Sequence, residues 1–153
     1  MTAKHINDIL RDLTIIVDTR ENENHHLISC FEQFGVKYIE RALKFGDYSF
    51  ECPAIPELGM MGSCSFENRI VIERKSGLDE LSGNIAQYRE RFENEFQKAK
   101  DAGAKLILMV EDGSYQKILK HQYRTGLNEK SYIASLFTFQ ARYGIDVQFI
   151  PAK

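Results

Sequence analysis

Residues 69–79 read Arg-Ile-Val-Ile-Glu-Arg-Lys-Ser-Gly-Leu-Asp. The first part, Arg69–Ile72, is mostly apolar and β-branched, which is typical of a buried strand. Three charged residues, Glu73, Arg74 and Lys75, then follow one another directly. Because side chains alternate along a strand, Glu73 and Lys75 share one face and Arg74 points to the other. The stretch therefore predicts a central strand that ends with a carboxylate beside an ammonium group.

A second acidic position lies upstream, where Gly46 and Asp47 precede the apolar stretch Tyr48–Cys52. Carboxylate oxygens are hard ligands that suit Mg²⁺, and a bound metal ion lowers the pKa of its water. Asp47 and Glu73 are thus the first candidates for metal ligands. Lys75 is the candidate for orienting or polarising the attacking water. Exposed strand acids and a surface lysine that extends its ammonium into water are the alternative interpretations.

These residues also resemble a known family. Gly46-Asp47, a gap, and then Glu73-Arg74-Lys75-x-x-x-Asp79 resemble the GD…ERKxxxD signature of the XPF-type structure-specific endonucleases. Upstream, Ile15–Glu21 resembles the VDxRE strand of the same family, and the likeness extends to about Val110. The resemblance implies an α/β fold, in which a restriction-endonuclease-like mixed central sheet is flanked by helices. It also implies Mg²⁺- or Mn²⁺-dependent hydrolysis of DNA phosphodiesters.

The resemblance assigns further residues to the site. The backbone carbonyl of Arg74 is implied as a third metal ligand, and Asp18 would bind the metal directly or through water. Arg20 and Glu21 would orient these groups or hold a phosphate, with a surface role as the alternative. The Arg74 side chain would grip phosphates bidentately, or pair with an acid on the opposite face. Asp79 closes the family motif, and its alternative role is to cap the following helix.

Positive charge follows the motif. Arg89 and Arg91 fall on different faces of a helix, so one of them could face a DNA groove, while Arg91 and Glu95 could form a surface pair. A denser basic stretch is interleaved with Tyr115 and Tyr123. Its members are Lys117, Lys120, His121, Arg124 and Lys130. This mixture suits phosphate contacts and the stacking of an unpaired base, with a solvated charged face as the alternative.

Length and composition indicate one globular domain over residues 1–153, with 43% hydrophobic and 27% charged residues. The net charge of −2 argues against a general DNA-coating protein, but not against a nuclease whose site is itself acidic. Cys30, Cys52 and Cys64 lack paired spacing and are interpreted as reduced thiols of a cytoplasmic protein that works on DNA. No stretch reaches the length of a membrane span, so no membrane partner is expected.

Apolar periodicity and breaker residues predict the elements. The expected helices are His5–Leu13, His25–Phe34, Leu78–Leu81, Asn84–Ala102, Ser114–His121 and Glu129–Tyr143. Asn24 is expected to cap the second helix, with Phe34 on its inner face, and Gly83 is expected to separate the third helix from the fourth. The expected strands are Thr14–Asp18, Val36–Ala42, Tyr48–Cys52, Arg69–Lys75, Lys105–Glu111 and Ile145–Ile150. Pro53–Asn68 is expected to be a long loop. The apolar run Leu106–Val110 predicts a strand buried on both faces, as in a parallel sheet.

The sequence interpretation is therefore a compact, single-domain endonuclease of bacterial or phage type, with a role in DNA repair or recombination. No helix-hairpin-helix module is recognisable, which leaves open whether it prefers branched or flapped DNA and whether it forms a homodimer. A junction resolvase or a nicking enzyme of the same fold is one alternative. Others are an inactive nuclease-like module that binds DNA or a protein, and a structural interaction domain. The intact set of Asp47, Glu73 and Lys75 argues against an inactive module.

Overall fold

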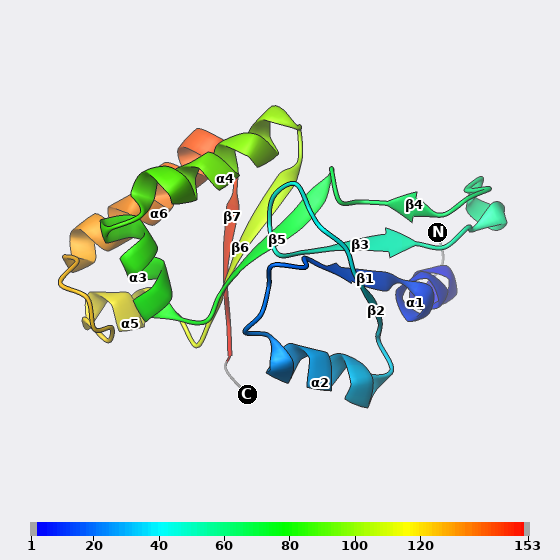
Figure 1. Ribbon diagram of the computed structural model, residues 1–153, viewed down its shortest axis with the longest axis horizontal. Coiled ribbons are helices and arrows are strands. Elements are labelled where there is room, and N and C mark those ends of the chain that lie inside the picture. The colour runs from blue at the N-terminus through cyan, green and yellow to red at the C-terminus, as the bar shows by residue number, and fades with distance from the viewer. Residues whose placement is uncertain (1–2, 152–153) are drawn as a thin grey trace. The chain divides into compact units, whose positions relative to one another are not determined.

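The computed structural model describes residues 3–151, without the side chains of residues 3–5, 8 and 58. The chain forms two compact units, one ending at Val71 and the other beginning at Ile72. Figure 1 labels their helices and strands. Among the described residues, no helix is both long enough and apolar enough to cross a membrane.

Unit 1 is built around a short apolar strand. Its elements are α1 (Ala3–Asp12), β1 (Thr14–Val17), α2 (His25–Phe34), β2 (Lys37–Glu40), β3 (Tyr48–Cys52), the 3₁₀ turn η1 (Pro56–Leu58) and β4 (Cys64–Ser65). Strand β1 pairs in parallel with β2 and antiparallel with β3, and β4 pairs with β3. Ile16 and Val17 of β1 are buried, together with Phe45 and Tyr48. This mixed arrangement fixes the ends of β1 and β3, where two of the predicted acids lie.

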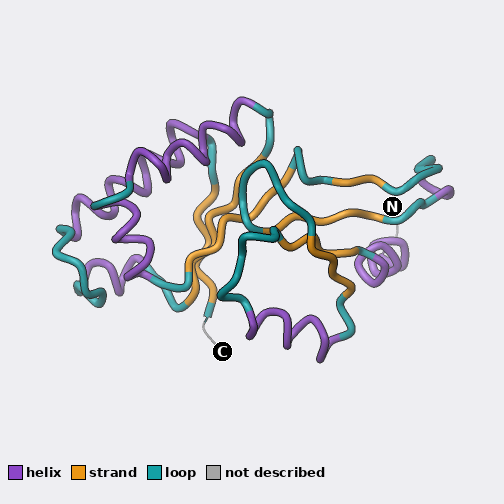
Figure 2. The backbone as a smooth tube through the Cα atoms, viewed as in Figure 1, coloured by secondary structure: helices purple, strands orange, loops and turns teal. Residues whose placement is uncertain are grey.

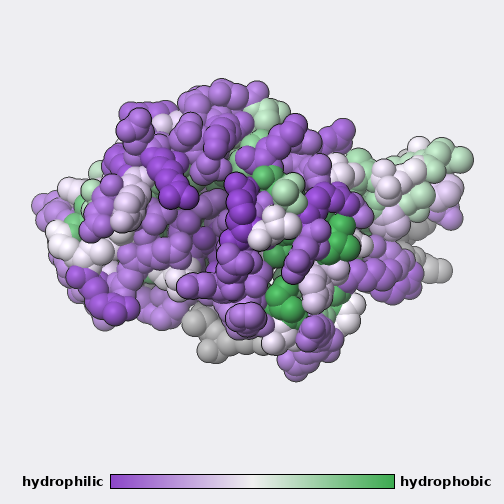
Figure 3. All heavy atoms as spheres, in the orientation of Figure 1, coloured by the Kyte–Doolittle hydropathy of each residue, from purple (hydrophilic) through white to green (hydrophobic). Residues whose placement is uncertain are grey.

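Unit 2 combines parallel strands with a helical layer. Its elements are β5 (Ile70–Lys75, which starts in unit 1), α3 (Leu78–Ala86), α4 (Arg89–Asp101), β6 (Lys105–Glu111), α5 (Tyr115–Leu119), α6 (Glu129–Tyr143) and β7 (Asp146–Ile150). The strand order is β5-β6-β7, and β6 is parallel to β7. Helices α4 and α6 pack on each other and against these strands (Figure 1). The surface over the helices of unit 2 is mainly hydrophilic in the view of Figure 3.

An aromatic cluster joins the helical layer of unit 2. The ring centroids of Phe92 and Phe96 are 4.5 Å apart, and those of Phe96 and Phe139 are 5.2 Å apart. All three rings are buried, as are Leu106 and Leu108 of β6. The seven-stranded mixed sheet with flanking helices confirms the predicted α/β class. The parallel pairing of β6 with β7 confirms one part of the interpretation of its apolar run. The expected burial on both faces is wrong, because Leu108 is buried but Ile107 and Met109 on the other face are half-buried.

Two helices that end at a left-handed glycine have the predicted bounds. Helix α6 has the predicted bounds, and the Asn128 side chain accepts hydrogen bonds from the backbone N–H groups of Lys130 and Ser131. Gly144 follows this helix at φ 68°, in the left-handed region that a residue with a Cβ adopts at a cost. Helix α2 also has its predicted bounds and ends at Gly35, with φ 65°.

The predicted break at Gly83 is wrong. Helix α3 continues through Gly83 to Ala86, and the break before α4 falls at Gln87 and Tyr88. Leu81 and Ile85, on one face of α3, are 0% and 4% exposed. Burial of these two side chains on either side of Gly83 outweighs the cost of about 1 kcal/mol that a glycine imposes on a helix.

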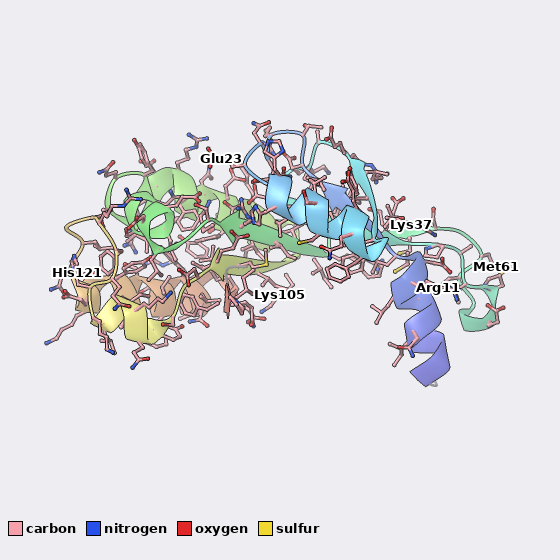
Figure 4. The ribbon with its side chains drawn as sticks, turned by 90° about the horizontal axis from the view of Figure 1, so that it is seen from below. Arg11, Glu23, Lys37, Met61, Lys105 and His121 are labelled. Carbon is pink, nitrogen blue, oxygen red and sulfur yellow. The ribbon has the colours of Figure 1, made fainter. Side chains whose placement is uncertain are left out.

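Three further expectations in unit 1 are also wrong. Pro53–Asn68 is not all loop, because it contains η1, β4 and a bridge between Ile55 and Met60 (Figure 2). Met61 is 81% exposed in this segment (Figure 4). Asn24 precedes α2, but its side chain makes no capping hydrogen bond within the described structure. Phe34, predicted on the inner face of α2, is 71% exposed.

Candidate functional site

The three charged residues at the end of β5 are all buried. Glu73, Arg74 and Lys75 are 7%, 5% and 7% exposed. The Lys75 ammonium donates to Glu73 Oε1 at 2.8 Å, so these two side chains share a face as predicted. Their burial excludes the interpretations of an exposed strand acid and of a lysine extended into water. Because buried charges are costly unless paired, this pair is a candidate functional group as well as a structural one.

Lys75 has a second acidic neighbour that the sequence analysis missed. Its Nζ lies 3.3 Å from Glu80 Oε1 and 5.1 Å from the centroid of the Phe92 ring. Glu80 Oε2 accepts hydrogen bonds from the backbone N–H and the hydroxyl of Ser76, both at 2.8 Å. Burial raises the pKa of Glu80, but the charge of Lys75 and the bonds from Ser76 outweigh it, so the pKa lies below its usual value. The sequence signal that could have identified Glu80 is its place in the first turn of a helix that begins after Gly77, where an acid is favoured.

The Arg74 side chain is held by an acid on the opposite face of β5. Its Nε and Nη2 donate to the two carboxylate oxygens of Glu111, at 2.9 and 3.1 Å. Glu111 is the last residue of β6 and is 9% exposed. The guanidinium was predicted either to grip phosphates or to pair with an acid on the opposite face of the strand. The structure shows the pairing with an acid. No pattern in the sequence assigns Glu111 as this partner.

A cleft of about 430 Å³ opens just after the motif strand. Asp79, Lys117 and Arg124 are among its lining residues, so the last residue of the motif and two cations of the basic stretch come together there. Asp79 Oδ1 accepts from the backbone N–H of Arg124, and Oδ2 accepts from Arg124 Nε, each at 2.6 Å. These bonds hold the pKa of Asp79 below its usual value. Gly77, not Asp79, occupies the N-cap position of α3, so the alternative capping role for Asp79 is wrong.

Two other residues predicted to contact DNA, Arg89 and Lys117, form hydrogen bonds and ion pairs within the protein. Arg89 Nε donates to Glu93 at 2.6 Å and its Nη1 donates to Ser135 at 2.9 Å. Arg91 is exposed on α4, while Glu95, its expected partner, pairs instead with Lys98 at 2.6 Å. Lys117 donates to the carbonyl oxygen of Asp112 at 3.0 Å and also pairs with its carboxylate.

The loop that follows α5 is ordered by its own contacts. Lys120 is exposed, and His121, labelled in Figure 4, has Nδ1 2.6 Å from Glu129 Oε1. Tyr123 is 7% exposed and packs edge-on against the buried Tyr132. The Tyr123 ring is buried and already stacks on His121, with ring centroids 4.2 Å apart, so this structure does not place it to stack on an unpaired base as expected.

In unit 1, Asp18 organises the chain that follows β1. It is 2% exposed. Its Oδ1 accepts from Arg20 N and Nε at 2.8 and 2.7 Å, and its Oδ2 accepts from Leu43 N at 2.6 Å. Burial raises the pKa of Asp18, but these hydrogen bonds outweigh it and lower the pKa. The backbone of Asp18 also accepts from Glu21 N at 3.0 Å and donates to the carbonyl oxygen of Asp47 at 2.8 Å. Asp18 thus joins Arg20, Glu21 and Asp47 in one hydrogen-bonded group.

The predicted metal ligands are carboxylate and carbonyl oxygens, the donors that hard divalent cations prefer. Glu73 supplies such a donor, as a buried carboxylate whose Oε1 accepts a hydrogen bond from Lys75. Asp47 is half-buried and directly precedes β3 in unit 1. Within residues 3–151, no three His, Cys, Asp or Glu side chains gather as a metal-binding cluster.

Comparison with known proteins agrees with the motif. The family model of the ERCC4 domain matches residues 17–153. Two solved structures of XPF from Aeropyrum pernix, one of them in complex with DNA, each match with a TM-score of 0.63 and 22% identity. Each match covers 90% of this chain but 56% of the Aeropyrum pernix chain, so the chain spans little more than half the length of those proteins. At this identity the likeness shows the XPF nuclease fold alone. No curated protein sequence matches the chain.

Proposed function

The chain belongs to the ERCC4 domain family, and on this premise we propose that it is a metal-dependent DNA endonuclease that hydrolyses phosphodiester bonds. The observation that carries the proposal is the buried pair of Glu73 and Lys75 at the end of β5. A charged pair that serves only solubility has no reason to be buried, whereas perturbed and buried charges are frequent at catalytic sites. The pair also lies within the ERK part of the family motif, in a segment that the family model matches.

The motif assigns Asp47, Glu73 and the backbone carbonyl of Arg74 as ligands for Mg²⁺ or Mn²⁺. Such an ion, when bound, supplies a water of lowered pKa and neutralises charge on the phosphate. The Arg74 side chain is paired with Glu111 on the opposite face of β5, so it is the backbone carbonyl of Arg74 that is assigned to the ion. Asp18 is proposed to act by holding the backbone of Asp47, because both of its oxygens already accept hydrogen bonds from Arg20 or Leu43.

Lys75 is proposed to stabilise negative charge on the phosphate or to orient the attacking water. Its ammonium is fixed by Glu73, Glu80 and the face of the Phe92 ring. A positive charge that is already positioned does not need to reorganise during the reaction, which is the basis of electrostatic catalysis. Arg124, whose side chain is 91% exposed beside the cleft, and Lys120 are proposed to contact DNA phosphates.

DNA as the partner is supported by the likeness to the Aeropyrum pernix protein solved in complex with DNA. Branched or flapped DNA is the proposed substrate class, and a homodimer is the proposed assembly. The test is cleavage of end-labelled single-stranded, duplex, flap and splayed-arm DNA, with Mg²⁺, Mn²⁺ or EDTA. The molar mass of the protein by light scattering, with and without DNA, tests the assembly.

The variants for this assay are Glu73→Gln and Asp47→Asn, with Glu95→Gln as the matched control. Glu95 is an acid of α4 that pairs with Lys98, away from the motif. We expect metal-dependent cutting by the wild type and the control, and a loss of roughly 10²-fold or more in each motif variant. Wild-type protein that binds these DNAs but cuts none of them would instead support a nuclease-like binding module.

A further inference from the structure

Lys75 lies between two carboxylates that have different surroundings. Its Nζ is 2.8 Å from Glu73 Oε1 and 3.3 Å from Glu80 Oε1. The side chains of Glu73 and Lys75 are 10% and 9% exposed, whereas that of Glu80 is 40% exposed. An ammonium group has three N–H donors and can serve both acids at once. One lysine is therefore shared by the proposed metal ligand and by an acid outside the family motif.

Glu80 is held independently of Lys75. Its Oε2 accepts from both the backbone N–H and the hydroxyl of Ser76, at 2.8 Å each, which leaves Oε1 toward the ammonium. It lies in the first turn of α3, where the helix dipole favours a negative charge. The second counter-ion of Lys75 is thus fixed in position whether or not Lys75 also contacts Glu73.

A metal ion at Glu73 would compete with the Lys75 ammonium for the same carboxylate. The ammonium cannot simply lose its partner, because a buried and unpaired charge is strongly destabilising. Glu80 is an acid that already lies within reach, with Oε1 3.3 Å from Nζ. The Phe92 ring, 5.1 Å from Nζ, favours a cation at the same place.

From this geometry we propose that Glu80 is a positioning residue, which receives the Lys75 ammonium when a divalent cation binds Glu73. This inference rests on the proposed function, since it assumes that Glu73 is a metal ligand. It adds that the chain carries a dedicated second partner for its catalytic lysine. Glu80 therefore sets how strongly the metal ion has to compete for Glu73.

The test is Mn²⁺ binding to the DNA-free protein of residues 1–153, measured by titration calorimetry and by the electron paramagnetic resonance signal of free Mn²⁺. Glu80→Gln keeps an oxygen that can accept from Ser76 but removes the charge, whereas Glu80→Ala removes both. We expect both variants to bind Mn²⁺ about 10-fold more weakly, the scale seen for groups that support metal ligands. If Glu80 only caps α3 through Ser76, Glu80→Gln binds Mn²⁺ as the wild type does, which overturns the inference.

A double-mutant cycle with Lys75→Met distinguishes two ways in which Glu80 could strengthen Mn²⁺ binding. Glu80 could draw the Lys75 ammonium away from Glu73, or its negative charge could attract the ion directly. If Glu80 acts through Lys75, Glu80→Gln has no effect on Mn²⁺ binding in the Lys75→Met background. An undiminished effect in that background overturns the inference. Thermal unfolding of each variant verifies that it is folded, and Glu95→Gln serves as the matched control on α4.

Glu73→Gln separates failure of the inference from failure of the proposed function. If Glu73→Gln abolishes Mn²⁺ binding while both Glu80 variants bind normally, the inference fails and the proposed metal site stands. If Glu73→Gln binds Mn²⁺ as the wild type does, the proposed metal site fails, and the inference fails with it.

Discussion

The Arg74 guanidinium is a buried charge that is paired with the Glu111 carboxylate. Two of its nitrogens donate to the two oxygens of Glu111, and the two side chains are 5% and 12% exposed. Removing one member of such a pair leaves an uncompensated buried charge, which costs about 3–5 kcal/mol. We therefore expect Glu111→Gln to lower the free energy of unfolding by that amount, measured by urea denaturation. Glu95→Gln, which breaks an exposed pair, should change it by less than about 1 kcal/mol. Equal effects of the two variants would contradict the buried-pair argument.

Asp18 makes stability depend on pH. Its pKa is lowered in the folded protein, because hydrogen bonds from Arg20 and Leu43 outweigh the effect of burial. A carboxyl whose folded pKa is depressed stabilises the protein above its unfolded pKa, and this contribution is lost as pH falls through the folded pKa. We expect Asp18→Asn to be less stable than the wild type near pH 7, and this difference to shrink below about pH 4. Urea denaturation across this pH range measures it. A difference that does not change with pH would contradict the prediction.

Sequence alone could predict how the motif residues divide between the faces of β5. Alternation along the strand placed Glu73 with Lys75 and separated Arg74, and the observed pairs confirm this. The partners Glu80 and Glu111 could not be assigned in the same way. Glu111 is 37 residues from Arg74, so its role depends on how β6 packs beside β5, for which no local pattern exists.

At the scale of elements, prediction succeeded where the ends of an element are set by local groups and failed where burial decides. Helix α6 has an Asn cap before it and a left-handed glycine after it, and both bounds were predicted correctly. Helix α3 was cut short because Gly83 looked like a stop signal. Its continuation depends on the burial of Leu81 and Ile85, which only the packed unit provides.

The turn between β6 and α5 depends on a glycine for reasons of space. A Cβ at Gly113 would lie 2.5 Å from Phe149 Cδ1 and 3.1 Å from Val110 Cγ1. Gly113→Ala should therefore destabilise the protein by about 1–3 kcal/mol, the usual cost of overpacking, as measured by urea denaturation. Gly126→Ala is the matched control, because a Cβ there meets no atom within 4 Å and its φ lies outside the left-handed region. Destabilisation of both variants to the same extent would show that the contact with Phe149 is not the cause.

At the scale of the whole molecule, attraction to DNA has to be local. The net charge is −2, so no general positive field favours binding to a polyanion. Many cations of unit 2 are neutralised by acids, as Arg124 is by Asp79 and Lys117 by Asp112. Lys120 differs, since it is exposed and has no ion pair within the part of the chain that the structure describes. A small number of phosphate contacts is therefore expected, with metal ions at the proposed site supplying the rest of the positive charge.

The salt dependence of DNA binding tests this view of the molecule. Each phosphate contact contributes about −0.9 to the slope of log K against log salt on duplex DNA. We expect a shallow slope for the whole protein, and a slope smaller by about 1 unit for Lys120→Ala, with a similar loss of affinity on every sequence. Fluorescence anisotropy with Glu73→Gln as the parent protein measures binding without cleavage. Lys98→Ala, which removes a cation already paired with Glu95, is the matched control and should leave the slope unchanged. If Lys120→Ala leaves the slope unchanged as well, the basic stretch after α5 does not contact DNA phosphates, and the contacts must come from another part of the chain.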